Sequence, residues 1–380
     1  MAKKKNIKNV IVAVLASLLW VAALTSLLPR VERVETGTIN EQVETASGAF
    51  YLELSGEHDL VVSTEGQTFL GSSSIDTLVL DGGKDGATIK AIGEGKGTIQ
   101  ATAGGELVMK NLTIVDETTD VYTAAYHSNL RFGGKLKFEN CAFATPIYIK
   151  DDAQAEFVDC TFHAGKTKFY SVWVADGSSK FENCTFTGYR GLKVHEFTGD
   201  DVVNVEINGC TFQGLKEKVG VAIGTFDIEP LRSTVAIRNS RFIDCQPWDV
   251  VGSLEGVDGI YEADMPTDEF VFVEENNTVE YTSTTRQIRY VAVINDTVCE
   301  IPSALWKTGG NYPQTYEIGT EYTIDGLYSA ATNSGEEYDF FGWYLDKACT
   351  VAFDGTVTSD MTGHITLYAK IEKDCWTAFY

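Results

Sequence analysis

Residues 181–186 read FENCTF and residues 138–143 read FENCAF, although the sequence between the two copies does not repeat. Four further segments share the pattern, with Asn, Asp or Gly at the third position and an apolar residue at the sixth: MKNLTI at 109–114, FVDCTF at 157–162, INGCTF at 207–212 and IRNSRF at 237–242. The fourth positions lie 29, 19, 24, 26 and 30 residues apart. Repeats of roughly 20–30 residues that are rich in strand formers are typical of a β-solenoid.

Each position of the hexad has a physical reason in a solenoid coil. The first residue ends one strand, and the third turns a sharp corner, because Asn, Asp and Gly enter the left-handed backbone region most easily. The fourth and sixth residues begin the next strand and, being two apart, face the same way. We expect them to face inward, which stacks Leu112, Cys141, Cys160, Cys184, Cys210 and Ser240 in one column and Ile114, Phe143, Phe162, Phe186, Phe212 and Phe242 in another.

The hexads, together with TLVLDGGKDGATI at 77–89 and ELVMKNLTI at 106–114, resemble the pectin-lyase-like superfamily over roughly residues 50–280. The resemblance implies an all-β fold, a right-handed parallel β-helix with asparagine ladders at the corner between the second and third strands of each coil. The superfamily includes lyases, glycosidases, epimerases, adhesins and phage tailspikes. It therefore predicts the fold and leaves the reaction open.

The cysteines that recur in the hexads have three interpretations. Eight cysteines in an exported protein favour disulfides. Stacked cysteines on adjacent coils, however, have parallel Cα–Cβ bonds, which hold the Cβ atoms wider apart than a disulfide prefers. A zinc site lacks a close Cys-x-x-Cys pair. We expect buried free thiols and no metal or cofactor, and the state of Cys245, Cys299, Cys349 and Cys375 stays open.

The N-terminus indicates the compartment. Residues 1–9 carry four lysines, and residues 10–28 are an uncharged apolar run. As a helix, this run would span roughly 28 Å, close to the hydrocarbon thickness of a bilayer. The sequence predicts an uncleaved signal anchor, with the C-terminal body outside by the positive-inside bias. The alternative is a cleaved signal peptide, and both place the body of the protein outside the cell.

Charge and composition divide the rest of the chain. Acidic residues outnumber basic ones by 54 to 30, and the formal net charge of −24 argues against nucleic acid as a partner. Residues 29–48 are polar and acidic, and we expect a linker there. Short runs of β-branched and aromatic residues then predict the β-helix at 49–283.

A second module is expected at 284–372, followed by a tail at 373–380. The segment 338–371 contains FGWY at 341–344, Asp346 and the closing Leu367-Tyr368-Ala369, and it resembles the Listeria-Bacteroides repeat, the internalin-B-type B-repeat. The resemblance implies a small β-grasp-like domain of bacterial surface proteins that provides spacing or attachment. The final tryptophan of the common ending is Ile371 here.

Function is sought on the outer face of the strands that precede the hexads. If Ile147, Ile149, Val172, Val174, Leu192 and Val194 point inward, strand alternation places their neighbours outside. The predicted exposed strip consists of Tyr148, Lys150, Trp173, Lys193 and His195, with Trp248 one coil later. Aromatic rings stack on sugar faces and polar groups bind hydroxyls, so the strip is a candidate site for polysaccharide or another cell-envelope ligand.

Three functions follow as hypotheses. The first is surface binding or adhesion through this strip. The second is a polysaccharide-degrading enzyme that uses Asp227, Glu229 and His195, since glycoside hydrolysis needs two carboxylates about 5–9.5 Å apart. The third is a structural spacer of the envelope. No complete polygalacturonase or pectate-lyase motif set is present, so the sequence favours binding over catalysis.

Overall fold

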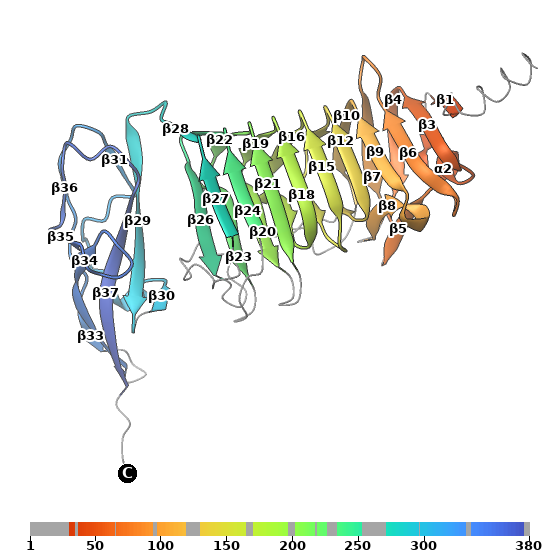
Figure 1. Cartoon of the computed structure of the whole chain (residues 1–380). Helices are drawn as coiled ribbons and strands as arrows, with labels where there is room; N and C mark the ends of the chain where they lie inside the picture. Colours follow the sequence, from red (N-terminus) through yellow and green to blue (C-terminus); the bar gives the residue numbers. More distant parts are fainter. Residues whose placement is uncertain are drawn as a thin grey trace, which may run out of the picture.

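Stacked parallel strands dominate the computed structural model (Figure 1). The structure describes residues 30–34, 37–64, 66–93, 97–118, 130–164, 170–196, 202–216, 219–225, 234–252, 271–295, 297–331 and 336–375. Within these residues the chain is a β-helix solenoid followed by a separate C-terminal β domain, and each part has its own hydrophobic core. The predicted all-β class and β-helix are confirmed.

Three parallel sheets form the solenoid. Sheet A contains β1 (Arg30–Val34), β3 (Gly48–Leu54), β6 (Ile75–Asp81), β9 (Glu106–Lys110), β12 (Lys135–Glu139), β15 (Gln154–Val158), β18 (Gly177–Glu182), β21 (Val203–Asn208), β24 (Thr234–Arg238) and β27 (Val271–Glu275). Sheet B contains β2 (Gly37–Thr38), β4 (Gly56–Val61), β7 (Ala87–Ile92), β10 (Leu112–Asp116), β13 (Ala142–Phe143), β16 (Thr161–Ala164), β19 (Thr185–Gly188), β22 (Thr211–Leu215), β25 (Arg241–Ile243) and β28 (Thr278–Glu280). Sheet C contains β5 (Gln67–Leu70), β8 (Thr98–Ala101), β11 (Arg131–Phe132), β14 (Ile147–Ile149), β17 (Tyr170–Val174), β20 (Arg190–Glu196), β23 (Val219–Thr225) and β26 (Gln246–Gly252).

The third hexad residue makes the corner between sheets A and B. Asn111, Asn140, Asp159, Asn183 and Asn239 have φ of 54°, 52°, 53°, 53° and 51°. Gly209 takes the same corner with φ of 65°. A residue with a larger side chain would be strained in this left-handed conformation, which explains why the third position accepts so few residue types.

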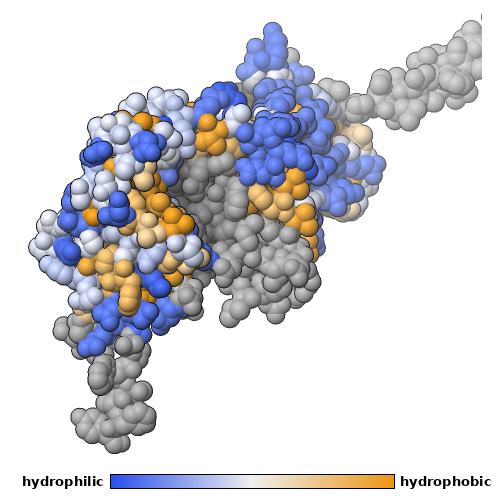
Figure 2. Space-filling model, turned by 60° about the vertical axis from the view of Figure 1, so that its left-hand side comes forward, coloured by the Kyte–Doolittle hydropathy of each residue, from blue (hydrophilic) through white to orange (hydrophobic). Residues whose placement is uncertain are grey.

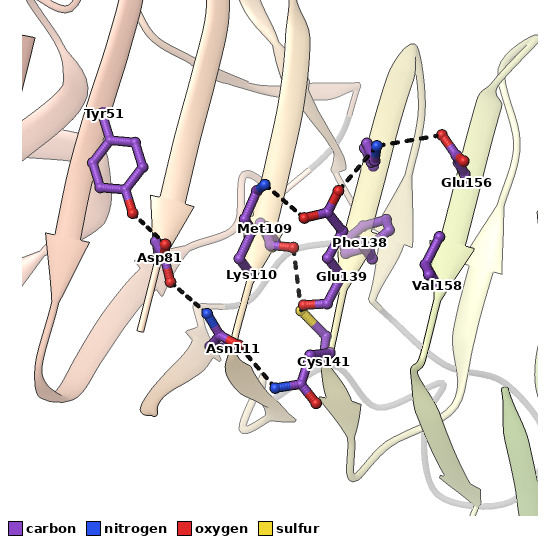
Figure 3. A network of polar contacts seen from close by, with 12 residues as sticks. Tyr51, Asp81, Met109, Lys110, Asn111, Phe138, Glu139, Cys141, Glu156 and Val158 are labelled. Atoms are coloured by element: carbon purple, nitrogen blue, oxygen red, sulfur yellow. Dashed lines mark hydrogen bonds and ion pairs between the residues drawn. The ribbon is translucent and has the colours of Figure 1, made fainter. Parts of the chain in front are cut away.

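Side-chain amides connect successive corners in a directional ladder (Figure 3). The Asn140 amide donates to the Asn111 side-chain oxygen at 2.8 Å, and the Asn111 amide donates to the Asp81 carboxylate at 2.8 Å. The Tyr51 hydroxyl also donates to Asp81 from the other side. The ionised carboxylate of Asp81 can only accept hydrogen bonds, so the series of side-chain donors ends at this residue.

Two columns of phenylalanine rings fill the core. In the sixth column, the ring centroids of Phe143, Phe162, Phe186, Phe212 and Phe242 follow one another at 5.0, 4.9, 4.5 and 4.8 Å, with interplanar angles of 16° or less. In the first column, the rings of residues 138, 157 and 181 stack at 4.8 Å. The spacing equals the distance between neighbouring strands, so the stacking follows directly from the parallel register.

The hexad cysteines are free and buried, as predicted. Each Sγ approaches the carbonyl oxygen two residues before it, at 3.5 Å in Cys141, 3.3 Å in Cys160, 3.4 Å in Cys184 and 3.6 Å in Cys210. In the next coil, the Ser240 hydroxyl donates to the Arg238 carbonyl at 2.8 Å in the same way. Cysteine therefore suits this position as a small apolar residue that still offers a weak donor to the corner.

The expected linker at 29–48 is wrong for most of its length. β1 pairs in parallel with β3, β2 pairs with β4, and helix α2 (Ile39–Val43) buries Ile39 and Val43 against the end of the core. The apolar residues of this polar stretch are sparse but correctly spaced to cap the solenoid. The predicted membrane helix at 10–28 lies outside the described residues, and the residues that are described contain no helix long and apolar enough to cross a bilayer.

The C-terminal domain is built on one mixed sheet. Its strands, with β29 and β37 parallel at the centre, are β29 (Thr285–Ile294), β30 (Thr297–Cys299), β31 (Thr315–Glu317), β33 (Ala330–Ala331), β34 (Glu336–Tyr344), β35 (Ala352–Phe353) and β37 (Ile365–Cys375). β32 (Tyr322–Thr323) pairs with β36 (Thr356–Val357), and short 3-10 turns lie at Ser303–Leu305 here and at Thr102–Gly104 in the solenoid. Trp343 is buried, and its indole donates to the Asp325 carbonyl at 2.9 Å, so this part of the FGWY motif forms core.

Replacing Phe162 with alanine will lower the free energy of unfolding by about 3–5 kcal/mol. The side chain is fully buried between two stacked rings, so its loss leaves a cavity. Urea denaturation followed by circular dichroism measures the effect. Thr161→Ala, at an exposed neighbour, is the matched control and should change stability by less than about 0.5 kcal/mol. An equal effect of both substitutions would contradict the stacked core.

Acid will weaken the N-terminal end of the ladder. Burial alone would raise the pKa of Asp81, but hydrogen bonds from Tyr51, Asn111 and the Gly83 amide lower it overall. The stabilisation is therefore present above the ordinary carboxyl pKa of about 3.9 and is lost as pH falls through the lower folded-state value. In urea titrations, Asp81→Asn should be less stable at neutral pH and lose less stability on acidification than wild type. Asp85→Asn, in the exposed part of the same turn, should behave like wild type.

The cysteine column will resist alkylation until the protein unfolds. The four thiols of the column are buried in the folded protein, so iodoacetamide cannot reach them before unfolding. Mass spectrometry after iodoacetamide treatment should find Cys299 and Cys349, which are only half buried, modified first. If the four column cysteines in native protein were modified as fast as Cys299 and Cys349, their burial would be disproved.

Candidate functional site: the outer face of sheet C

Alternate residues of each strand in sheet C face the core and the outside, so side chains of neighbouring strands form inner and outer rows. The residues predicted to face inward, Ile147, Ile149, Val172, Val174, Leu192 and Val194, are fully buried in the solenoid core. Between them, the strand register aligns a second row across the whole sheet: Gln67, Thr98, Arg131, Tyr148, Trp173, Lys193, Ala222 and Asp249. This outer row contains three residues of the predicted strip.

Two aromatic rings lie between two cations in the middle of the outer row. The Arg131 guanidinium lies 5.7 Å from the centroid of the Tyr148 ring. Tyr148 and Trp173 meet edge to face at 4.5 Å, and the Lys193 ammonium lies over the Trp173 ring at 4.4 Å. Four side chains from four neighbouring strands therefore form one continuous stack, held by ring quadrupoles and the two cations.

A second group adjoins the stack where the chain passes from sheet B into sheet C. Arg190 lies 5.2 Å from the Tyr170 ring and 5.5 Å from the Tyr189 ring, and Lys216 lies 5.8 Å from Tyr189. The Lys193 ammonium reaches Tyr170 at 5.6 Å and joins the two groups. A chain of net charge −24 thus gathers four cations and four aromatic rings on this face.

Burial differs from the prediction at the centre of the strip. Trp173 is 3% exposed and Lys193 is 5% exposed, so the expectation of an exposed strip is wrong for both. Trp173 packs in one buried cluster with Tyr170, Ala175 and Ala222. A cation over a ring contributes about 2 kcal/mol or more when water is removed from both. Tyr148 and Arg131 remain partly exposed, so the accessible part of the stack lies on β11 and β14.

The other predicted residues lie at different places in the chain. His195 belongs to β20, opposite Gly224 of β23. In β26 the strand register pairs Trp248 with Val221 and Asp249 with Ala222, and a role of Trp248 in binding stays a prediction. Asp227 and Glu229 lie outside the described residues, so their suggested catalytic role stays a prediction.

Sequence reasoning missed the second group and Arg131. β11 has only two residues and no hexad lies close before it, which hid Arg131 among loop residues. The usable signal was Leu130-x-Phe132, the same spacing of inward residues as Ile147-x-Ile149. Tyr170 and Arg190 pair at the first residues of their strands, where alternation does not yet predict a face.

The outer face of sheet A has a different chemistry. Lys110 and Lys137 approach the Glu139 carboxylate at 2.6 and 2.9 Å, and Lys137 also approaches Glu156 at 3.8 Å (Figure 3). The hydrogen bonds from both lysines lower the pKa of Glu139. Such partly exposed pairs contribute little stability and keep the surface hydrated. Figure 2 likewise shows hydrophilic residues over most of the solenoid surface at the end nearest the N-terminus.

The described residues contain no group of three or more His, Cys, Asp or Glu side chains placed to hold a metal ion. What the accessible part of the outer face of sheet C offers is the Tyr148 side chain and the positive charge of Arg131. This combination can bind a ligand with both apolar faces and polar or anionic substituents.

Comparison with known proteins identifies the C-terminal part of the chain. No curated protein sequence matches the chain. Residues 307–370 match the family model of the Listeria-Bacteroides repeat domain, which confirms the module predicted from the FGWY segment and the closing Leu367-Tyr368-Ala369. The segment 307–370 is therefore similar to the Listeria-Bacteroides repeat domain.

Proposed function

We propose that this protein is a bacterial cell-surface binding protein whose solenoid contacts a glycan or another cell-envelope ligand through the outer face of sheet C. The observation that carries the proposal is the in-register stack of Arg131, Tyr148, Trp173 and Lys193. The solenoid is proposed to be a right-handed β-helix of the pectin-lyase-like type. That superfamily includes both adhesins and enzymes, so the proposal rests on the side chains of this face.

The chemistry of the stack fits a sugar ligand. The buried Trp173 and Lys193 form a rigid base, and the partly exposed Tyr148 offers a ring edge and a hydroxyl beside it. The Arg131 side chain is partly exposed, so the accessible part of its guanidinium can donate charged hydrogen bonds to a ligand oxygen. A row of strands about 4.8 Å apart can meet successive units of an extended chain.

The repeat supports a location at the cell surface. Listeria-Bacteroides repeats suggest a bacterial surface protein, and this one follows the solenoid in the chain. Together with the apolar run at 10–28, this supports a single-pass membrane protein whose body lies outside the cell. We propose that the β-grasp-like repeat provides spacing or attachment, while the solenoid binds.

Two substitutions test the binding face. On a glycan array that includes neutral and acidic polysaccharides, Tyr148→Ala and Arg131→Gln should each weaken binding of the recognised glycan by roughly tenfold, equivalent to about 1.4 kcal/mol. Lys180→Ala, an exposed lysine paired with Glu206 on sheet A, and Tyr328→Ala, an exposed tyrosine of the repeat, are the matched controls and should bind as wild type does.

The outcomes separate the candidate functions. Failure of the wild-type ectodomain to bind any envelope glycan would contradict the proposal. Release of reducing ends or unsaturated products, abolished by Asp227→Asn or Glu229→Gln, would replace binding by catalysis. Thermal melts of each variant must first match wild type. Trp173→Ala is unsuitable for this test, because the loss of a buried indole costs about 3–5 kcal/mol of stability.

A further inference from the structure

His58 occupies a core position that is apolar in the coils that follow. It lies on β4 and is 1% exposed, and the register aligns it with Ile89, Ile114 and Phe143 of the sixth hexad column. On its other side, the register neighbour is Gly37 of β2, and helix α2 packs against β4. A histidine thus lies near the start of this inward column, next to the N-terminal cap that β1, β2 and α2 form.

The hydrogen bonds of His58 fit the neutral imidazole. The Nε2 atom lies 3.1 Å from the Ser55 carbonyl oxygen, which can only accept, so Nε2 carries the hydrogen. The Nδ1 atom is buried and has no hydrogen-bond partner in the described part of the chain. A proton added at Nδ1 would therefore place a positive charge in the core and create a second N–H group that has no acceptor.

The charged groups around His58 point away from it. Glu57 and Asp59, its neighbours on β4, are exposed, and Glu57 pairs with Lys90 of β7 at 2.8 Å. Glu41 and Glu44, on and directly after α2, are exposed as well. β2 has no ionisable side chain. Within the described residues, then, His58 forms no ion pair that would stabilise an imidazolium.

The elements of the cap, β1, β2 and α2, are short. Asn40 of α2 exchanges two hydrogen bonds with the backbone of Val61, at 2.7 and 3.0 Å, and Ile39 and Val43 supply the buried apolar contact. β2 contains two residues, and β1 has sheet pairing on one side only. A short element at the end of a solenoid opens more easily than the coils behind it.

We propose that His58 makes the N-terminal cap acid-responsive, so that protonation of its imidazole releases β1, β2 and α2 from the solenoid. The open cap lets water reach the charged ring and leaves β3 and β4 as unpaired edges of sheets A and B. Such edges are competent to pair with another extended chain. The protein would thereby change its N-terminal end between neutral and mildly acidic surroundings.

Hydrogen exchange of the full-length chain in detergent tests the proposal. If only the open state is protonated and its solvated imidazole has the ordinary pKa of about 6.5, the equilibrium constant for opening rises by up to about thirtyfold between pH 7.5 and pH 5.0. After correction for intrinsic exchange rates, wild-type peptides from 37–47 should lose protection by a factor approaching this value, while peptides from the stacked core should not. His58→Phe, which restores the residue of the later coils, and the smaller His58→Leu should abolish the change.

The control is His163→Gln. His163 is an exposed histidine on the outer face of sheet B that bonds Thr187 at 2.8 Å, so its removal should leave the acid response intact. An acid response in both His58 variants equal to that of wild type would overturn the proposal. Unchanged protection of the wild-type cap between the two pH values would overturn it as well. If His58→Phe does not fold, His58→Leu alone decides.

Discussion

The left-handed corner between sheets A and B is the constraint on which the solenoid depends. One residue must reverse the chain at φ of about +50° to +65°, which restricts the position to Asn, Asp or Gly. Because every coil turns at the same place, equivalent residues of successive coils come into register. The phenylalanine columns, the thiol column and the amide ladder all result from this alignment, since it stacks side chains of the same type on successive coils at the inter-strand spacing.

Departures from the repeat have local consequences that follow from the same register. Gly209 has no side chain, so the amide of Asn239 donates instead to Asn208, at 2.8 Å. Asp81 ends the ladder on an acceptor, which makes that corner dependent on pH. His58 places a titratable ring where later coils have aliphatic or aromatic side chains. A one-dimensional fold tolerates such exceptions because each coil touches only its neighbours.

The same register assembles the proposed binding face from residues far apart in sequence. Arg131, Tyr148, Trp173 and Lys193 come from four coils, and no short motif contains more than one of them. The stack is partly buried, so its central members hold the geometry and its partly exposed members offer the contact. The outer face of sheet A, with its hydrated ion pairs, lacks this combination of ring surface and positive charge.

The sequence by itself determined the winding of the chain, because corner residues and inward columns depend on local backbone preference and on a period that can be counted. A local motif in the segment 338–371 also indicated the Listeria-Bacteroides repeat, and the family model matches residues 307–370. The tertiary structure alone decided that β1, β2 and α2 pack onto the end of the solenoid and that Trp173 and Lys193 are buried. These depend on loop lengths and on side chains from other coils, and neither leaves a periodic trace in the sequence.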